Sequence, residues 1–225
     1  MPSDRTAKYV HSPDRTLEWF WYSFLYFQAA ETLAEAYRAR TFGADTLFPP
    51  LIYNVRHALE LMLKFLVYSL GEIPANLSHH NVQTIFGGVK TAIASLDDES
   101  LTFAASGLGV KKELIAQALQ AATLRVETLT GKYFSYTFLP TPIEDKKNEL
   151  FRYPVTTESG PFDISGCHTR LSADEILADT KELSGFLLFV VGAFAKNEKG
   201  LHIYDEINAQ SAGTHGHADH EGVGA

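Results

Sequence analysis

The stretch that decides the fold is residues 50–70, PLIYNVRHALELMLKFLVYSL. Its apolar residues recur at the three- and four-residue steps of an α-helix, and these are Ile52, Val55, Leu59, Met62, Leu66 and Leu70. Leu63 and Phe65 make this apolar face wider than a half-exposed helix needs. The sequence therefore predicts a central helix that is buried on most of its sides.

A polar stripe interrupts this apolar surface at the same helical steps, and its members are Tyr53, His57, Glu60, Lys64 and Tyr68. One interpretation is a network of surface ion pairs, each worth about 0.2–0.5 kcal/mol. The other is that the stripe, with Arg56 at its edge, lines a cleft against the loop that carries His79 and His80. Such a cleft would bind an anionic group such as a phosphate.

Composition restricts the classes of function. The chain has 225 residues, of which 45% are hydrophobic and 20% charged, as is usual for a globular protein. The formal net charge of -8 argues against a broad, nonspecific nucleic-acid surface, because phosphate neutralisation needs clustered Lys and Arg. A local basic pocket remains open.

Targeting signals are not seen in the sequence. The polar opening MPSDRTAKYVHSPDRT has no apolar segment of the kind found in secretory signals. The longest apolar runs, residues 19–27 and 186–195, are shorter than the roughly 20 residues that span a bilayer. We therefore expect a cytoplasmic protein with no membrane partner.

Two further helices frame the central one in the expected fold. The first runs to about Arg40 and is rich in aromatic residues, which form either core or a second packing surface, within the chain or between two copies. Residues 41–48 are then a connection, and Pro49 and Pro50 begin the central helix. The last helix starts at the capping box of Ser172 and Glu175 and ends at about Asn197.

The middle of the chain is less regular. Residues 80–96 predict a weaker helix that is broken or kinked at Gly87 and Gly88. Residues 97–109 are expected to be a connector, and residues 110–129 a helix that stops at Gly131. After it, residues 132–140 and 149–155 are short extended candidates, and their prolines exclude long strands.

These elements predict an all-α, antiparallel four- to five-helix bundle with a short extended or hairpin excursion before the last helix. Residues 1–205 would form one domain. Residues 206–225 are rich in Gly and His and are expected to be a flexible tail.

Two segments carry a family resemblance. Residues 57–64, HALELMLK, followed by Gly71 and by HNVQTI at residues 80–85, resemble the A-x-E-x-x-x-K helix, glycine and H-D-L-like helix start of the HEPN helical-bundle family. The second segment, FRYP at residues 151–154, is similar to the R-Y-P box of HEPN proteins associated with nucleotidyltransferases. In those proteins the box is typically followed by an acidic-capped last helix, which residues 173–191 resemble. Asn81 stands where the family often has Asp.

The resemblance implies a homodimeric module that binds nucleotide or RNA phosphate and acts with a nucleotidyltransferase or an antitoxin-like partner. No metal or other cofactor is expected. The candidate ligand-binding residues are Arg56, His57, Glu60, Lys64, His80 and Arg152.

Two alternatives stay open. Many HEPN proteins are metal-independent ribonucleases that pair an Arg with a His in a dimer cleft. The family spacing occurs here only at Arg5 and His11, before the first helix, so Arg152 and His168 are the remaining catalytic candidates. The other alternative is a structural homodimerisation protein without a ligand.

Two further groups of residues are of types that occur in catalytic or metal sites, but the sequence does not favour either role for them. Cys167 lies next to His168, yet sequence neighbours rarely form a catalytic pair, so we interpret it as a structural or surface cysteine. Three histidines in the tail have no further groups to orient them around a metal, and they are His215, His217 and His220.

Overall fold

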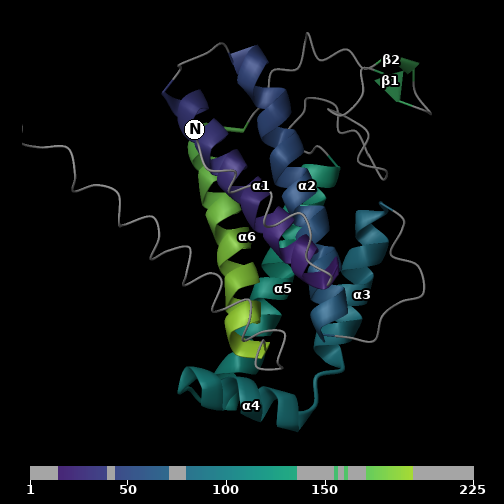
Figure 1. The fold of residues 1–225 in the computed structure, drawn as a ribbon, viewed down its shortest axis with the longest axis vertical. Helices are drawn as coiled ribbons and strands as arrows, with labels where there is room; N and C mark the ends of the chain where they lie inside the picture. Colours follow the sequence, from purple (N-terminus) through teal and green to yellow (C-terminus); the bar gives the residue numbers. More distant parts are fainter. Residues whose placement is uncertain are drawn as a thin grey trace, which may run out of the picture.

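Six helices build the protein in the computed structural model, which describes residues 15–39, 44–70, 80–135, 155–156, 160–161 and 171–194. The helices are α1 (Arg15–Arg38), α2 (Ala44–Leu70), α3 (Val82–Ala94), α4 (Asp98–Leu108), α5 (Lys112–Phe134) and α6 (Ala173–Phe194). Two-residue strands β1 (Val155–Thr156) and β2 (Gly160–Pro161) form an antiparallel pair. The predicted all-α bundle is confirmed, with six helices in place of four or five (Figure 1).

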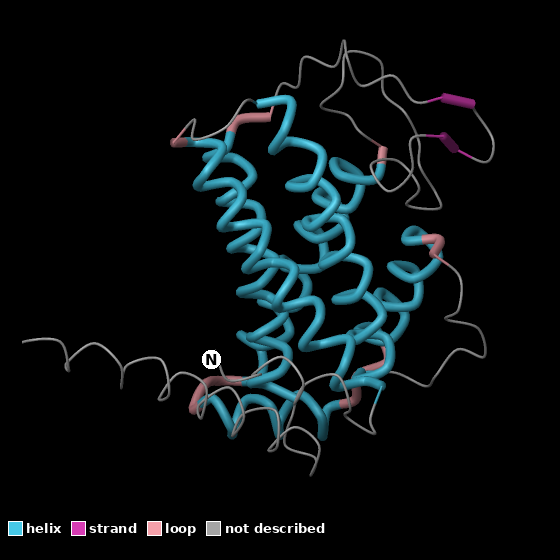
Figure 2. Tube along the Cα trace, turned by 45° about the horizontal axis from the view of Figure 1, so that its top comes forward, coloured by secondary structure: helices cyan, strands magenta, loops and turns pink. Residues whose placement is uncertain are grey.

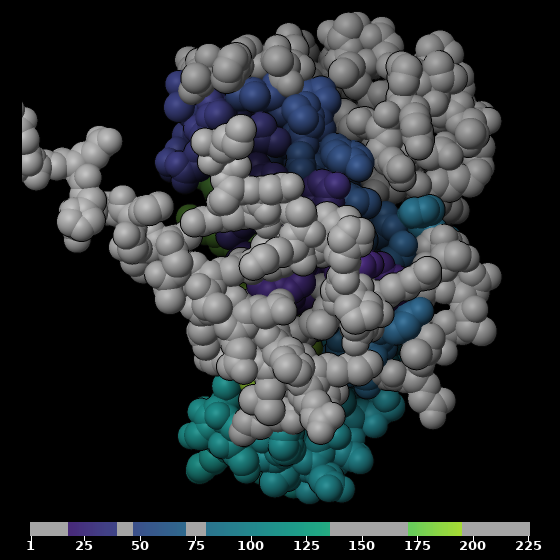
Figure 3. Space-filling model, in the orientation of Figure 1, coloured from purple at the N-terminus to yellow at the C-terminus, as the bar shows by residue number. Residues whose placement is uncertain are grey.

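The central helix of the bundle is α2. Figure 1 shows α1 crossing it, α6 beside α1, and α4 lying across one end of the bundle. In the space-filling view, the teal residues that include α4 form the surface at that end (Figure 3). The strand pair lies apart from the helices (Figure 2). The apolar face predicted for α2 is fully buried at Ile52, Val55, Leu59, Met62 and Leu66.

The start of α2 differs from the prediction. The helix begins at Ala44, so Pro49 and Pro50 lie inside it rather than at its first position. A proline inside a helix removes a backbone hydrogen bond and costs about 3 kcal/mol. Leu47 and Phe48, which precede the prolines, are buried in the core, and this burial offsets part of that cost.

Of the two alternatives predicted at Gly87 and Gly88, the break is wrong, because α3 is continuous from Val82 to Ala94, and the kink stays a prediction. Packing explains Gly88, where a Cβ would lie 3.2 Å from Cγ2 of Val67 on α2. A Cβ at Gly87 would meet nothing within 4 Å. Gly88 therefore lets α3 approach α2 closely, and Gly87 has no such role.

The two glycines give a matched prediction. Gly87→Ala is expected to increase the free energy of unfolding by about 0.5–1 kcal/mol, because alanine loses less backbone entropy in a helix. Gly88→Ala has the same entropic advantage, but its Cβ would lie too close to the Val67 side chain. Urea denaturation should therefore show Gly88→Ala to be less stable than Gly87→Ala, and equal stabilities would contradict the close approach.

The connector expected at residues 97–109 is a helix, α4. Asp97 is its N-cap, and its carboxylate accepts a hydrogen bond from the backbone N–H of Ser100 at 2.8 Å. Gly109 ends the helix with a positive φ of 67°, a conformation that glycine adopts without steric cost. The caps were present in the sequence, but the weak apolar pattern between them hid the helix.

The end of α5 also lies beyond the prediction. The helix passes through Gly131, the expected stop, and ends at Phe134, so residues 132–134 are helical rather than extended. Tyr133 and Phe134 are buried, and this burial favours the additional turn. Residues 136–140 and 149–154 of the extended candidates lie outside the described residues, and the strand pairing described is between β1 and β2.

The capping box predicted for the last helix is confirmed. The backbone N–H of Glu175 donates to Oγ of Ser172 at 3.1 Å, and the N–H of Ser172 donates to the Glu175 carboxylate at 3.0 Å. This second bond, from a backbone donor, is the main cause that lowers the pKa of Glu175 below its ordinary value.

The lowered pKa gives a pH prediction for Glu175→Gln. The parent should be more stable than this variant at neutral pH, because the ionised carboxylate accepts the stronger hydrogen bond. The folded pKa is below the unfolded one, so the advantage exists above the ordinary carboxyl pKa and is lost as the pH falls through the folded value. Chemical denaturation at about pH 7 and about pH 3 measures it. A difference independent of pH would contradict the prediction.

The aromatic helix α1 serves mainly as core. Phe20, Trp21 and Phe27 are buried, in agreement with the core interpretation. Tyr22 and Leu25 are 37% and 46% exposed, so one side of the helix also presents an apolar surface. Among the described helices, none has the length and apolar character needed to cross a membrane.

Candidate functional site

The polar stripe of α2 centres on a buried carboxylate. Glu60 is 1% exposed, and its Oε1 accepts a hydrogen bond from Nζ of Lys64 at 2.8 Å. The two residues are one helical turn apart, and Lys64 is buried as well. A charge this deep must be paired, because an isolated carboxylate in an apolar interior costs several kcal/mol.

His80 reaches the same carboxylate from outside the helix. Its Nδ1 lies 2.8 Å from Oε1 of Glu60, while 49% of its side chain is exposed. An ionised carboxylate only accepts hydrogen bonds, so Nδ1 carries the proton and donates it. The Glu60 bond therefore orients the ring and leaves Nε2 as the nitrogen that is not engaged by Glu60.

The local fold holds His80 in place. It directly precedes Asn81, the N-cap of α3, whose side chain accepts a hydrogen bond from the backbone N–H of Thr84 at 3.1 Å. The Asn81 side chain thus caps α3, as an aspartate at this position would, because both side chains supply an acceptor oxygen.

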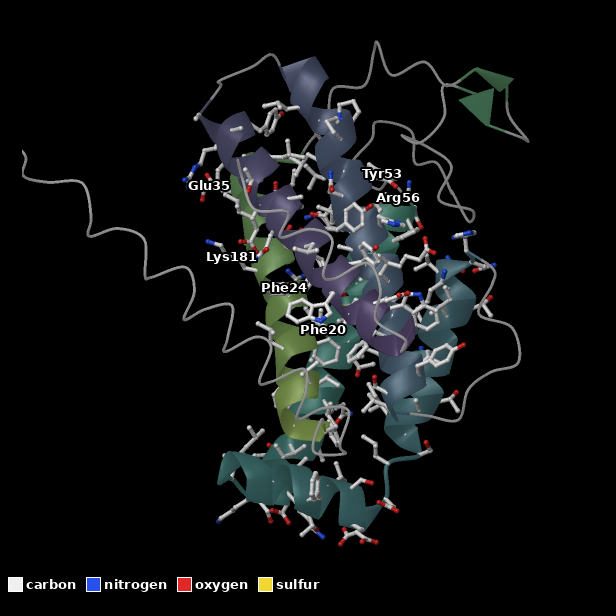
Figure 4. All side chains as sticks on the ribbon, viewed as in Figure 1. Phe20, Phe24, Glu35, Tyr53, Arg56 and Lys181 are labelled. Carbon is white, nitrogen blue, oxygen red and sulfur yellow. The ribbon has the colours of Figure 1, made fainter. Side chains whose placement is uncertain are left out.

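Arg56 lies one turn before Glu60 and is completely buried. Its guanidinium carbon is 4.5 Å from the centroid of the Phe134 ring, at the end of α5. This cation–π contact links α2 to α5 and is stronger in a desolvated environment. Figure 4 shows Arg56 close to Tyr53 on α2.

His57 packs against aromatic rings rather than against the charged pair of Glu60 and Lys64. Its ring stacks on Tyr53 with centroids 5.5 Å apart and planes 12° apart, and it meets Tyr26 of α1 nearly at right angles at 4.6 Å. These three rings are half-buried. The stripe therefore begins with an aromatic segment, Tyr53 and His57, and continues with a charged segment, Glu60 and Lys64. Its last member, Tyr68, meets the Trp19 ring edge to face at 4.5 Å.

The structure corrects one interpretation of the stripe and leaves the other as a prediction. A surface ion-pair network is wrong, because Glu60 and Lys64 are buried. His80 does come together with Glu60, as the cleft hypothesis requires. The other predicted residues lie outside the described ranges of the chain, and they are Arg5, His11, His79, Arg152, Cys167, His168, His215, His217 and His220.

A second buried carboxylate, Asp179 on α6, was not predicted. It accepts hydrogen bonds from Nη2 of Arg125 at 3.2 Å, Nζ of Lys132 at 2.6 Å and the hydroxyl of Tyr133 at 3.0 Å. The sequence carried a signal, because Asp179 falls between Ile176 and Leu183 on the inner face of α6.

The Asp179 group is saturated with partners and joins α5 to α6. Burial, and then the negative charge of Asp179, raise the pKa of Tyr133, so this phenol stays protonated and remains a donor. With three donors on one carboxylate and no exposed reactive group, the arrangement is suited to structure rather than to binding.

Among the described residues, two grooves flank α5, and Arg125, a partner of Asp179, lines one of them. One, of about 360 Å³, lies between α3, α4 and α5 and has the Lys90–Glu127 ion pair among its lining residues. The other, of about 270 Å³, lies between α5 and α6 and is lined mainly by small and aromatic residues, among them Ala118, Ala122, Gly185, Phe186 and Phe189. Neither groove brings together groups suited to acid–base chemistry.

The chemistry available to the described residues is therefore concentrated at Glu60 and His80. Within the described ranges no group of three or more His, Cys, Asp or Glu side chains is placed to hold a metal ion. A carboxylate-oriented imidazole can donate to an anion when protonated or accept a proton when neutral. Comparison of the chain with protein-family models, curated proteins and solved structures gives no match.

Proposed function

We propose that this protein is a HEPN-like module that binds the phosphate of a nucleotide or of RNA, with His80 as the residue that contacts the phosphate. The observation that supports the proposal is the bond between Nδ1 of His80 and the buried Glu60 carboxylate, together with the half-exposed ring. A protonated imidazole held in this way donates from Nε2 to a phosphate oxygen.

The buried cations support the site rather than contact the ligand. Lys64 donates to the carboxylate that holds His80, and Arg56 lies on the Phe134 ring. Both belong to the predicted ligand-binding set but are buried, whereas 49% of the His80 side chain is exposed. Arg152, outside the described residues, stays within the proposal through the R-Y-P resemblance.

The family resemblance adds an expected assembly and an expected partner to the proposal. It implies a homodimer that acts with a nucleotidyltransferase or an antitoxin-like partner. The exposed Tyr22 and Leu25 of α1 are residues that a second copy could cover. Light scattering at increasing concentration tests the dimer, and a monomeric mass throughout would contradict it.

The binding test uses His80→Ala, because a half-exposed residue can be removed with the fold intact. Titration calorimetry with AMP and with a short single-stranded RNA should show saturable binding to the parent. We expect His80→Ala to weaken both by about 10-fold or more, as for the loss of a charge-assisted hydrogen bond.

Lys90→Ala is the matched control for this test. Lys90 is an exposed cation on α3, the helix that follows His80, and it pairs with Glu127 rather than Glu60. Its removal should leave both affinities unchanged. Equal losses in the two variants would indicate nonspecific charge attraction, and the absence of any binding to the parent would reject the proposal.

A metal-independent ribonuclease is the second candidate, and the same pair of residues favours it. A carboxylate on Nδ1 with Nε2 directed elsewhere is the arrangement of a histidine general base. Incubation of labelled RNA with the protein in EDTA separates the candidates. A binding module leaves the RNA intact, whereas cleavage that His80→Ala abolishes would establish the nuclease.

A further inference from the structure

The aromatic segment of the stripe has a geometry of its own. The rings of Tyr53 and His57 are nearly parallel, and the ring of Tyr26 stands at 88° to the first and 83° to the second. Tyr26 belongs to α1, and the other two residues belong to α2. The three rings thus form a corner where these helices meet.

This corner differs from the fully buried part of the α1–α2 contact. The aromatic residues that serve as core there, Phe20 and Phe27, are fully buried and purely apolar. Tyr26, Tyr53 and His57 are half-buried, and each carries a polar edge. Half-buried rings with polar edges are typical of surfaces that bind planar, partly polar molecules.

The corner lies beside the proposed phosphate site. His57 precedes Glu60 by three residues, which is about 4.5 Å along a helix axis, and both lie on the same side of α2. His80 is bound to that same Glu60. A ligand whose phosphate is at His80 can therefore extend along α2 and reach the rings.

We propose that Tyr26, Tyr53 and His57 form the stacking surface for an unpaired base of the nucleotide or single-stranded RNA whose phosphate His80 binds. The inference rests on the proposed function and names its ligand class. A base stacked on the parallel pair would meet the Tyr26 ring at nearly a right angle, one of the two arrangements that aromatic rings favour. Duplex RNA would be excluded, because its bases stack on each other.

The test compares four ligands by titration calorimetry: ribose 5-phosphate, AMP, a short single-stranded RNA and the duplex of the same length. AMP should bind about 10-fold or more tightly than ribose 5-phosphate, since stacking of one base adds that much affinity. The single strand should bind more tightly than the duplex.

The variant Tyr26→Leu distinguishes the contribution of the base to affinity from that of the phosphate. We expect it to reduce AMP affinity, because the base loses its contact with the Tyr26 ring, and to leave ribose 5-phosphate affinity unchanged. Tyr37→Leu is the matched control, because Tyr37 is a half-buried tyrosine of the same helix that packs on Phe48 instead. Circular dichroism verifies the fold, and Tyr53→Leu provides a second variant with the same expected result.

The outcomes distinguish the two proposals. If ribose 5-phosphate and AMP bind equally well, or if the duplex binds as well as the single strand, the stacking inference is overturned while phosphate binding stands. If none of the four ligands binds, phosphate binding is rejected and the inference fails with it. Equal losses of AMP affinity in Tyr26→Leu and Tyr37→Leu would also overturn the inference, because a general loosening of α1 would then explain them.

Discussion

Replacement of Glu60 by alanine is expected to reduce the free energy of unfolding by about 3–5 kcal/mol. The carboxylate is buried, and its removal leaves the ammonium group of Lys64 in an apolar interior without the acceptor that lies 2.8 Å away. His80 loses the same acceptor, but water can replace it because half of that side chain is exposed. Urea denaturation followed by circular dichroism measures the loss.

A double variant shows whether burial of the charge is the cause. Glu60→Leu with Lys64→Met removes both charges and keeps the apolar volume, so it should be considerably more stable than Glu60→Ala. A double variant as unstable as Glu60→Ala would mean that the loss comes from packing of the side-chain stem rather than from the unpaired cation.

Replacement of Asp179 by alanine is also expected to have a large effect and to reduce the free energy of unfolding by about 3 kcal/mol. It removes the common acceptor of Arg125, Lys132 and Tyr133. Arg125 keeps its bond to Glu182 at 2.9 Å, but the Tyr133 hydroxyl lies in a buried environment where a lost partner is expensive. Thermal or urea unfolding measures the difference from the parent.

Asp174→Ala is the matched control on the same helix. Its side chain is 77% exposed and pairs only loosely with Arg38, at 3.7 Å, among the described contacts. Exposed pairs of this kind contribute about 0–1 kcal/mol, so the control should differ little from the parent. Similar losses in the two variants would refute a special role for the buried carboxylate.

The helices with strong apolar periodicity or a strong cap could be predicted from the sequence. α2 was recognised from its wide apolar face, and α6 from the reciprocal bonds of Ser172 and Glu175. Elements whose bounds depend on tertiary contacts could not be predicted from the sequence. Local propensity predicts a break or kink at Gly88, because the close approach to Val67 cannot be read from it. It likewise predicts that α5 ends at Gly131, whereas burial of Tyr133 and Phe134 favours a further turn.

The candidate site was only partly predicted, for the same reason. Helical spacing placed Tyr53, His57, Glu60 and Lys64 on one side of α2, but burial depends on what packs against that side. Spacing alone could not divide the stripe into a stacked aromatic segment and a buried charged segment, nor bring Phe134 onto Arg56. Apolar spacing identifies the inner face of α6, but it cannot show that a carboxylate on that face meets three donors from α5.

The contacts of Tyr133 and Phe134 have a consequence for synthesis on the ribosome. Phe134 lies under Arg56 of α2, and the adjacent Tyr133 is held by Asp179, which follows it by 46 residues in the chain. Until α6 has emerged, the end of α5 lacks this acceptor, and the buried arginine of α2 depends on an element that is not yet fixed. α2 can pack on α1 as soon as both helices have emerged, whereas the end of α5 obtains its acceptor only after Asp179 has been synthesised. The last contacts of the bundle therefore form late, and apolar surface that is exposed until then is what chaperones bind.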